Sequence, residues 1–598
     1  MSETRGKLRE MSAKLDYIAL LVIYLVIRMP DILVVDHFVT LIFPLDLFYY
    51  SKLLFSGFGV NPAITDSVVA PANASLIYPP GIYLLSTMFG SVRNAFYLLL
   101  AIQSVVPLLS YRLLKPVVPR MFAFVVAIFV AYYGTSARIW YPDYIVQPLM
   151  AGVVVLMIAK AKVIRPWHLL VCGLASGLII ILKHNEGICF AALIVTMIFF
   201  QSCDLHPNKK DRFVGYLFLF GVLGSGLVFG FRLPYWDEVA FYLLPYFAFW
   251  LFVLKLYLRG ELSLDAREFI TKGAVYLAAA LVFPVTVFLW FGSTIGYQRY
   301  WYSLFGMGFD HIKFWDFGIW GIFQSYFNSG GRWSVNKGFI LISLVGPFFL
   351  NMAGIWTLYR SKEYDDPKKL ERLLVVAVGV MAAFMLFPLE DHKIAVSKMF
   401  IFLYVFAFLL TNISPVAWKI ASCTALILAL PIATATARNV LSVATVDTAA
   451  GTPEMQRIID MPLQQEIAEE LGKQIGVLKR SIHNKPYLVL ASEMSPLMTL
   501  PILVDNVDPQ YYVRLDAPAL NETVVERVES MLEKAPFVIV NAKDYRAPIL
   551  EDDDFRRLME YTRARFSAID EYIEPVNASS AVKHIDGFVV LKAKKYIE

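Results

Sequence analysis

The chain has 598 residues, of which 58% are hydrophobic and only 17% charged, and its mean hydropathy is +0.58. This composition excludes a soluble protein of this size, which would need a far more polar surface. The net charge of +5 comes from short basic clusters between apolar runs, a pattern typical of membrane topology rather than of nucleic-acid binding. We therefore expect a polytopic α-helical membrane protein.

Apolar runs long enough to cross a bilayer, which takes about 20 residues, occur repeatedly along the chain. No small-residue cleavage site follows the first run, so we expect it to be retained as a helix. Thirteen spans are predicted, near 16–35, 94–113, 121–137, 144–160, 166–183, 187–202, 213–232, 237–258, 272–292, 338–358, 372–389, 399–413 and 417–436.

Basic clusters fall on every second connection between the predicted spans, beginning with RGKLRE before the first. The positive-inside bias places these connections, and the N-terminus, in the cytoplasm. With an odd number of spans, the residues after 436 then lie outside. The sequence thus predicts a transmembrane domain over 1–436 and an extracytoplasmic domain over 437–598.

Two of the predicted outer segments, 31–93 and 292–337, are unusually long. Structureless loops of that length are uncommon unless they are functional. Aromatic stretches such as Ile312–Phe327 suit helices that lie in the membrane interface. Such helices would cover a cavity that admits a lipid from the outer leaflet and a second substrate from water.

The region 437–598 has a different pattern, that of an α/β domain. Buried strands are predicted over Lys485–Glu493 and Ala535–Asp544, with an amphipathic helix over Glu522–Ala535 between them. A last strand is predicted over Gly587–Lys594.

Asp46 lies in the stretch FPLDLFYY, just after the first span. A carboxylate near the hydrocarbon boundary is costly unless it is paired, hydrated or functional. It could act as a general base that deprotonates an incoming hydroxyl or amine. It could equally cap an interfacial helix over Leu47–Phe55. Asp143, after Pro142 at the second outer connection, offers the same choice between a second functional carboxylate and a helix start.

Four stretches resemble the GT-C superfamily of membrane glycosyltransferases that use polyprenyl-phosphate sugars. The first outer segment carries Asp46, Tyr50 and Gly57, followed by YPPG at Tyr78–Gly81. The others are YPDYIVQPL (Tyr141–Leu149), GLASGLIIILKHNEG (Gly173–Gly187) and EDHKIAVSKMFIF (Glu390–Phe402). The layout is similar to aminoarabinose transferases, protein mannosyltransferases and catalytic subunits of oligosaccharyltransferases.

The resemblance implies an inverting glycosyltransferase with a polyprenyl-monophosphate sugar donor and a lipid, glycan or protein acceptor. Its partners would be membrane lipids and no nucleic acid, and its location a bacterial inner membrane with an extracytoplasmic active site. Asp46 and Asp143 would be catalytic. Cationic donors would stabilise the departing phosphate. The residues expected to bind the donor are Tyr50, Tyr78, Arg138, Lys183, His184, Arg299, Arg332, His392 and Lys393.

Lys183 is the most telling of these cations, because it follows an apolar run at the predicted outer edge of the membrane. There its ammonium could meet a lipid phosphate. It could also be a snorkelling lysine at a helix end, neutralised by Glu186.

A divalent cation, Mg²⁺ or Mn²⁺, is the only cofactor that the resemblance raises. Several GT-C members carry an acidic pair in the first outer loop, whereas Leu45 and Leu47 flank Asp46 here. A metal would need ligands from separate segments, and Asp143 is the best candidate for the second carboxylate.

Other functions stay open at this point. An O-antigen ligase or polymerase would use a pyrophosphate-linked donor, typically with outer arginines and a histidine. A lipid or sugar translocase usually shows internal repeats, and none is clear in this sequence. A receptor whose outer domain binds the ligand would leave the long aromatic outer segments unexplained.

Overall fold

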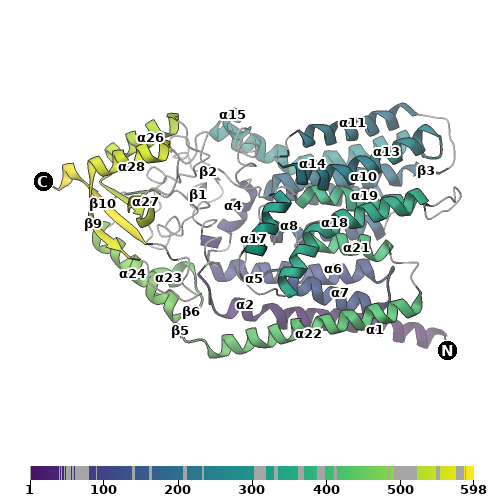
Figure 1. The fold of residues 1–598 in the computed structure, drawn as a ribbon, viewed down its shortest axis with the longest axis horizontal. Helices are drawn as coiled ribbons and strands as arrows, with labels where there is room; N and C mark the ends of the chain where they lie inside the picture. The colour runs from purple at the N-terminus through teal and green to yellow at the C-terminus, as the bar shows by residue number, and fades with distance from the viewer. Residues whose placement is uncertain are drawn as a thin grey trace.

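The chain forms a bundle of long apolar helices with a smaller α/β part at one end (Figure 1). This is a computed structural model. It describes residues 2–38, 41, 44–45, 48, 51, 55–56, 59–60, 80–88, 90–137, 142–159, 164–205, 212–231, 233, 235–301, 318–328, 335–360, 369–386, 398–409, 414–482, 485, 487–490, 522–546, 553–573, 585 and 587–597.

A helix lies at each of the thirteen predicted spans. The helices of the bundle are α1 (Ser2–Arg28), α5 (Val92–Gln103), α6 (Val105–Leu114), α7 (Arg120–Tyr133), α8 (Pro142–Ala159), α9 (Pro166–Leu182), α10 (His184–Gln201), α11 (Arg212–Gly230), α12 (Trp236–Glu238), η2 (Val239–Leu243), α13 (Leu244–Leu258), α14 (Ala266–Ile295), α18 (Val335–Arg360), α19 (Lys369–Ala383), η4 (Phe384–Leu386), α21 (Met399–Leu409) and α22 (Pro415–Thr445).

Within the residues that the structure describes, seven helical segments are long and apolar enough to cross a membrane. The helices α7, α9 and α21 are apolar but shorter. A multi-pass membrane protein is therefore supported, and a total of thirteen membrane crossings stays a prediction. The seven segments are Val92–Leu114, Pro142–Ala159, His184–Gln201, Arg212–Gly230, Trp236–Leu258, Ala266–Thr294 and Pro415–Thr445.

The outer face of the bundle is apolar, as a lipid-facing surface must be. On α11, Phe213 is 76% exposed and Phe231 is 88% exposed. Inside the bundle, α9 crosses α14 at two glycines. A Cβ at Gly173 would lie 2.4 Å from the Tyr276 carbonyl oxygen, and one at Gly177 would lie 2.5 Å from that of Ala280. Small residues of this kind let two membrane helices approach closely.

The segments between the long helices carry short elements. These are α2 (Pro30–Leu33), β1 (Phe55–Ser56), β2 (Gly59–Val60), α4 (Pro80–Thr87), β3 (Cys203–Asp204), β4 (Ser263–Leu264), α15 (Tyr297–Trp301) and α17 (Gly318–Asn328). Short helices thus occur in both long segments, 31–93 and 292–337. The helix α4 packs on α9, where a Cβ at Gly81 would lie 2.4 Å from the Ile181 carbonyl oxygen.

The C-terminal part is built on a four-stranded sheet in the order β7-β8-β10-β9. The pair β7–β8 is parallel, and β10 pairs antiparallel with both β8 and β9. Its elements are β5 (Thr448–Ala449), α23 (Pro453–Ile458), β6 (Leu463–Gln464), α24 (Gln465–Ile482), β7 (Tyr487–Leu490), α26 (Glu522–Lys534), β8 (Phe537–Asn541), α27 (Ala542–Arg546), α28 (Asp553–Arg565), β9 (Phe566–Tyr572), β10 (Phe588–Ala593) and η7 (Lys594–Tyr596).

Both faces of this sheet are covered, because successive side chains of a strand point to opposite faces. Leu488 and Leu490 join the core formed with α26 and α28. Tyr487 and Val489 join the core that contains α24. The three predicted strands and the predicted helix are present, whereas β9 was not predicted. The helix α22 continues through the expected boundary at 436/437 and ends at Thr445.

The C-terminal part is attached to the segment that follows α1. The Val35 amide donates to the Pro462 carbonyl (3.0 Å), and the Gln464 amide donates to the Val35 carbonyl (2.9 Å). The Arg93 amide also donates to the Ile459 carbonyl at 3.2 Å. These contacts hold the α/β part over the end of the bundle at which α1 ends and α5 begins (Figure 1).

Candidate functional site

Four charged side chains meet inside the helical bundle: Asp143, Lys183, Glu186 and Lys398. Asp143 lies in the first turn of α8 and Glu186 in the first turn of α10. Lys183 separates α9 from α10, and Lys398 precedes α21. We call this group the ionic cluster.

Each lysine of the ionic cluster contacts both carboxylates. Lys398 Nζ donates to Asp143 Oδ1 and to Glu186 Oε1, at 2.7 Å in each case. Lys183 Nζ donates to Asp143 Oδ2 and lies 3.3 Å from Glu186 Oε1. Each lysine therefore lies against both acidic side chains, and this pairing offsets part of the desolvation cost of burying the four groups.

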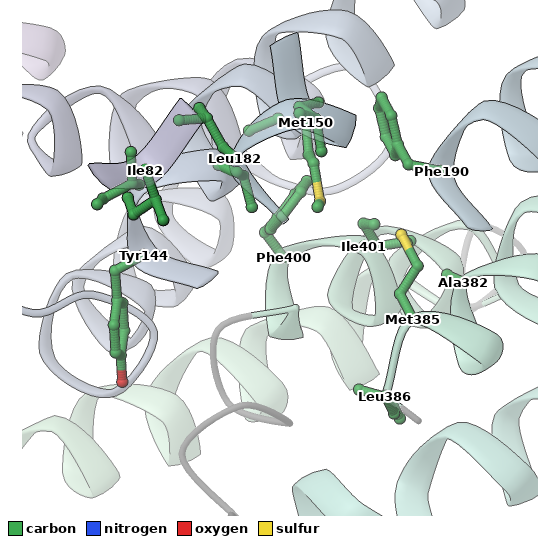
Figure 2. Packing of buried hydrophobic residues seen from close by; sticks show 14 of the residues in the cluster. Ile82, Tyr144, Met150, Leu182, Phe190, Ala382, Met385, Leu386, Phe400 and Ile401 are labelled. Atoms are coloured by element: carbon green, nitrogen blue, oxygen red, sulfur yellow. The ribbon is translucent and has the colours of Figure 1, made fainter. Parts of the chain in front are cut away.

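The ionic cluster is withdrawn from solvent. The side chains of Asp143, Glu186 and Lys398 are at most 1% exposed, and that of Lys183 is 8% exposed. The residues next to the charges are apolar: Tyr144, Leu182 and Phe400 all belong to the main hydrophobic core. Figure 2 shows Leu182 and Phe400 close to Met150, with Tyr144 and Phe190 on either side of them.

The local backbone explains how Lys183 reaches the interior. Its φ of −151° and ψ of 98° are extended, so α9 ends there and α10 starts at the next residue. Gly187 allows α10 to fold back on α9, because a Cβ there would lie 2.5 Å from the Ile180 Cα. Asp143 and Glu186 both occupy helix N-terminal turns, where the helix dipole favours a carboxylate.

One oxygen of the ionic cluster is unsatisfied. Glu186 Oε2 is buried and has no hydrogen-bond partner among the residues that the structure describes. A buried unpaired oxygen is costly, so native structures hold few of them and often at functional positions.

The structure brings two of the predicted site residues together. Asp143 and Lys183 are in direct contact, and Asp143 also occupies the helix-start position that was its alternative. His184 begins α10 beside them and is half-buried. The backbone of Arg299 lies in α15. The predicted residues Asp46, Tyr50, Tyr78, Arg138, Arg332, His392 and Lys393 lie outside the described residues.

The segment around Asp46 is partly described. Leu45 and Phe48 are helical and buried, and the Ser51 hydroxyl donates to the Tyr83 carbonyl at 2.7 Å. This hydrogen bond attaches the start of the first outer segment to α4. The roles predicted for Asp46 as base or cap stay predictions.

Lys398 was missed in the sequence, and Glu186 was considered only as a neutralising partner of Lys183. Its position in the sequence could have identified it, because Lys398, like Lys183, adjoins an apolar span at the predicted outer side. The sequence prediction instead named His392 and Lys393 in the same stretch. The contact with Asp143 spans 255 positions, which no local pattern reveals.

The described residues do not fit a divalent cation. Among them, no group of three or more His, Cys, Asp or Glu side chains converges. The two carboxylates that do meet, Asp143 and Glu186, face lysine ammoniums. Asp46, the first predicted carboxylate, lies outside the described residues, so a site for Mg²⁺ or Mn²⁺ stays a prediction.

No protein-family model matches the chain. No curated protein sequence matches it either. Solved structures do match, including the oligosaccharyltransferase AglB of Archaeoglobus fulgidus in complex with an inhibitory peptide and a dolichol-phosphate. That match has 12% identity and a TM-score of 0.45, and covers 99% of this chain and 75% of AglB.

A second match is ArnT of Cupriavidus metallidurans bound to undecaprenyl phosphate, with 12% identity and a TM-score of 0.28. It covers 92% of this chain and 97% of ArnT. Oligosaccharyltransferases are among the proteins whose layout the sequence resembles. With TM-scores below 0.5, these similarities assign no activity to this chain.

Proposed function

We propose that this protein is an inverting glycosyltransferase of GT-C type. It would transfer a sugar from a polyprenyl-monophosphate donor to a lipid, glycan or protein acceptor on the extracytoplasmic side. The observation that carries the proposal is the ionic cluster within an apolar helical bundle. Ionisable side chains inside a membrane protein mark substrate sites far more often than chance placement would.

In this proposal the cationic and the acidic side chains have different roles. Lys183 is the most exposed member of the ionic cluster, at 8%, and offers an ammonium to a departing lipid phosphate. Asp46, on the first outer segment, would take the proton of the acceptor hydroxyl or amine as it attacks the anomeric carbon. In-line attack with departure of the phosphate on the opposite side inverts the sugar configuration.

The site would be open to the outer leaflet. We place the C-terminal α/β part on the same side, where it would cover the cavity or help to dock the acceptor. Its attachment to Val35 and Arg93, which flank the first outer segment, is the contact that supports this placement. A bacterial inner membrane is the proposed location.

The decisive experiment is product analysis with the full-length protein in lipid nanodiscs. Undecaprenyl-monophosphate sugars are supplied with mixed membrane acceptors, and the released lipid and the anomeric configuration of the product are determined. We expect polyprenyl monophosphate and an inverted linkage. Reaction only with pyrophosphate-linked donors, or donor translocation without transfer, would overturn the proposal.

A matched pair of variants links the activity to the cluster. Lys183→Met should lower kcat/KM at least about tenfold, the effect of losing one charge-assisted contact to phosphate. Lys255→Met is the control. Lys255 lies in the last turn of α13 over the Tyr359 ring, away from the ionic cluster, and its loss should leave transfer unchanged.

A further inference from the structure

The two lysines of the ionic cluster are not equivalent. Lys398 is 1% exposed and sits between the carboxylates, 2.7 Å from an oxygen of each. Lys183 is 8% exposed. Its ammonium lies 3.3 Å from Glu186 Oε1 and closer than that to Asp143 Oδ2. Lys398 is thus the more deeply buried of the two lysines, and Lys183 is the one closer to the surface of the site.

We propose that Lys398 is a positioning residue that makes Lys183 available to the donor phosphate. An anion can bind the Lys183 ammonium only if its ion pairs with Asp143 and Glu186 are weakened. Lys398 makes this possible because it neutralises both carboxylates from the inner side. The inference rests on the proposed function in one respect, that a lipid phosphate meets Lys183.

The charge count gives the consequence of removing Lys398. With both carboxylates ionised, removing Lys398 leaves two negative charges facing the single ammonium of Lys183, a net charge of −1 for the cluster. Lys183 is then held by both carboxylates, and an incoming phosphate meets net repulsion. Removing the charge of Asp143 as well leaves the Lys183 ammonium paired with the Glu186 carboxylate alone. The affinity for the lipid phosphate should then return, although a second residue of the cluster has been changed.

The test is equilibrium binding of undecaprenyl phosphate to the full-length protein in nanodiscs, without any sugar or acceptor. Lys398→Met should weaken binding at least about tenfold, or 1.4 kcal/mol. Lys398→Arg keeps the charge and should bind the lipid phosphate more tightly than Lys398→Met does. The double variant Asp143→Asn/Lys398→Met should recover to within about threefold. Undecaprenol and inorganic phosphate, used as separate probes, distinguish recognition of the lipid chain from recognition of the phosphate.

A residue with a merely structural role would behave differently. Its double variant would bind more weakly than Lys398→Met, since two buried partners are lost. That result, or wild-type affinity in folded Lys398→Met, would overturn the inference. If Lys398→Met alone fails to fold, Lys398→Arg and the double variant provide the comparison. Binding is measured without turnover, so absence of transferase activity would count against the proposed function and not against this inference.

Discussion

Lys398 Nζ lies 2.7 Å from Glu186 Oε1, although the two residues are 212 positions apart in the chain. This contact joins the start of α21 to the start of α10, and through Asp143 to the start of α8. Three helix N-termini are therefore held together by charge within an otherwise apolar core. If the proposed function holds, stability and donor binding depend on the same few side chains.

Removing a carboxylate from the ionic cluster should be strongly destabilising. Glu186→Ala leaves Lys183 and Lys398 to share Asp143, with a net buried charge of +1. The expected cost is about 3–5 kcal/mol, as for breaking other buried ion pairs. Thermal denaturation in detergent measures it.

Glu268→Ala is the control for that change, because it removes an exposed carboxylate, 44% accessible, from its pair with Lys272. Its cost should stay below about 1 kcal/mol. Adding Lys398→Met to Glu186→Ala should recover part of the lost stability by restoring the charge balance. Equal small effects of Glu186→Ala and Glu268→Ala would contradict a central role for the cluster.

The positions of the apolar helices could be predicted from the sequence because hydropathy is a local property. The same holds for β7, β8 and β10, whose apolar runs stand out. In contrast, β9 reads FSAIDEY, and its interior residues are half-buried or exposed, so no buried run marks it. The helix α22 extends beyond the predicted span to Thr445, and ARNVLSVAT carries no helix-breaking residue that would end it sooner.

The site could be predicted only in part. Asp143 and Lys183 each stood out as a charge beside an apolar span. Their mutual pairing depends on how α8 packs against α9, and that packing follows from tertiary contacts. Lys398 gave the same local signal as Lys183, but its importance comes entirely from partners on α8 and α10.

The first catalytic prediction concerns Asp46. Asp46→Asn should reduce transfer at least about 100-fold, the usual contribution of a general base, while the protein still folds and inserts. Asp66→Asn, in the same outer segment, is the matched control and should retain turnover. Wild-type turnover by Asp46→Asn would exclude the base assignment and leave the helix-cap interpretation.

Close packing of α9 on α14 gives a second stability prediction. Gly173→Ala would place a Cβ 2.4 Å from the Tyr276 carbonyl oxygen and 2.6 Å from the Ala279 Cβ, so the helices must separate. We expect destabilisation of about 1–3 kcal/mol. Gly221→Ala on α11 meets no atom within 4 Å and should be neutral or stabilising by up to about 1 kcal/mol. The thermal midpoints of the two variants in detergent decide between these expectations.

The α/β part carries an acid-sensitive contact between α23 and α24. The hydrogen bond from Lys479 lowers the pKa of Glu454 from 4.5 to about 2. A carboxylate with a depressed pKa contributes stability above its unfolded value, and this contribution is lost as the pH falls from 4.5 toward 2. Both side chains are partly exposed, so the effect should be small and screened by salt.

Hydrogen exchange of the α23 and α24 peptides, compared between about pH 5 and pH 3, measures this contact in the full-length protein. Wild type should lose protection on acidification by more than Lys479→Met, in which the contact is already absent. Glu526→Gln removes an exposed carboxylate on α26 and should respond to acid as wild type does. An identical loss of protection in wild type and Lys479→Met would show that the Glu454–Lys479 pair does not hold α23 against α24, and that the acid response of this region arises elsewhere in the sheet.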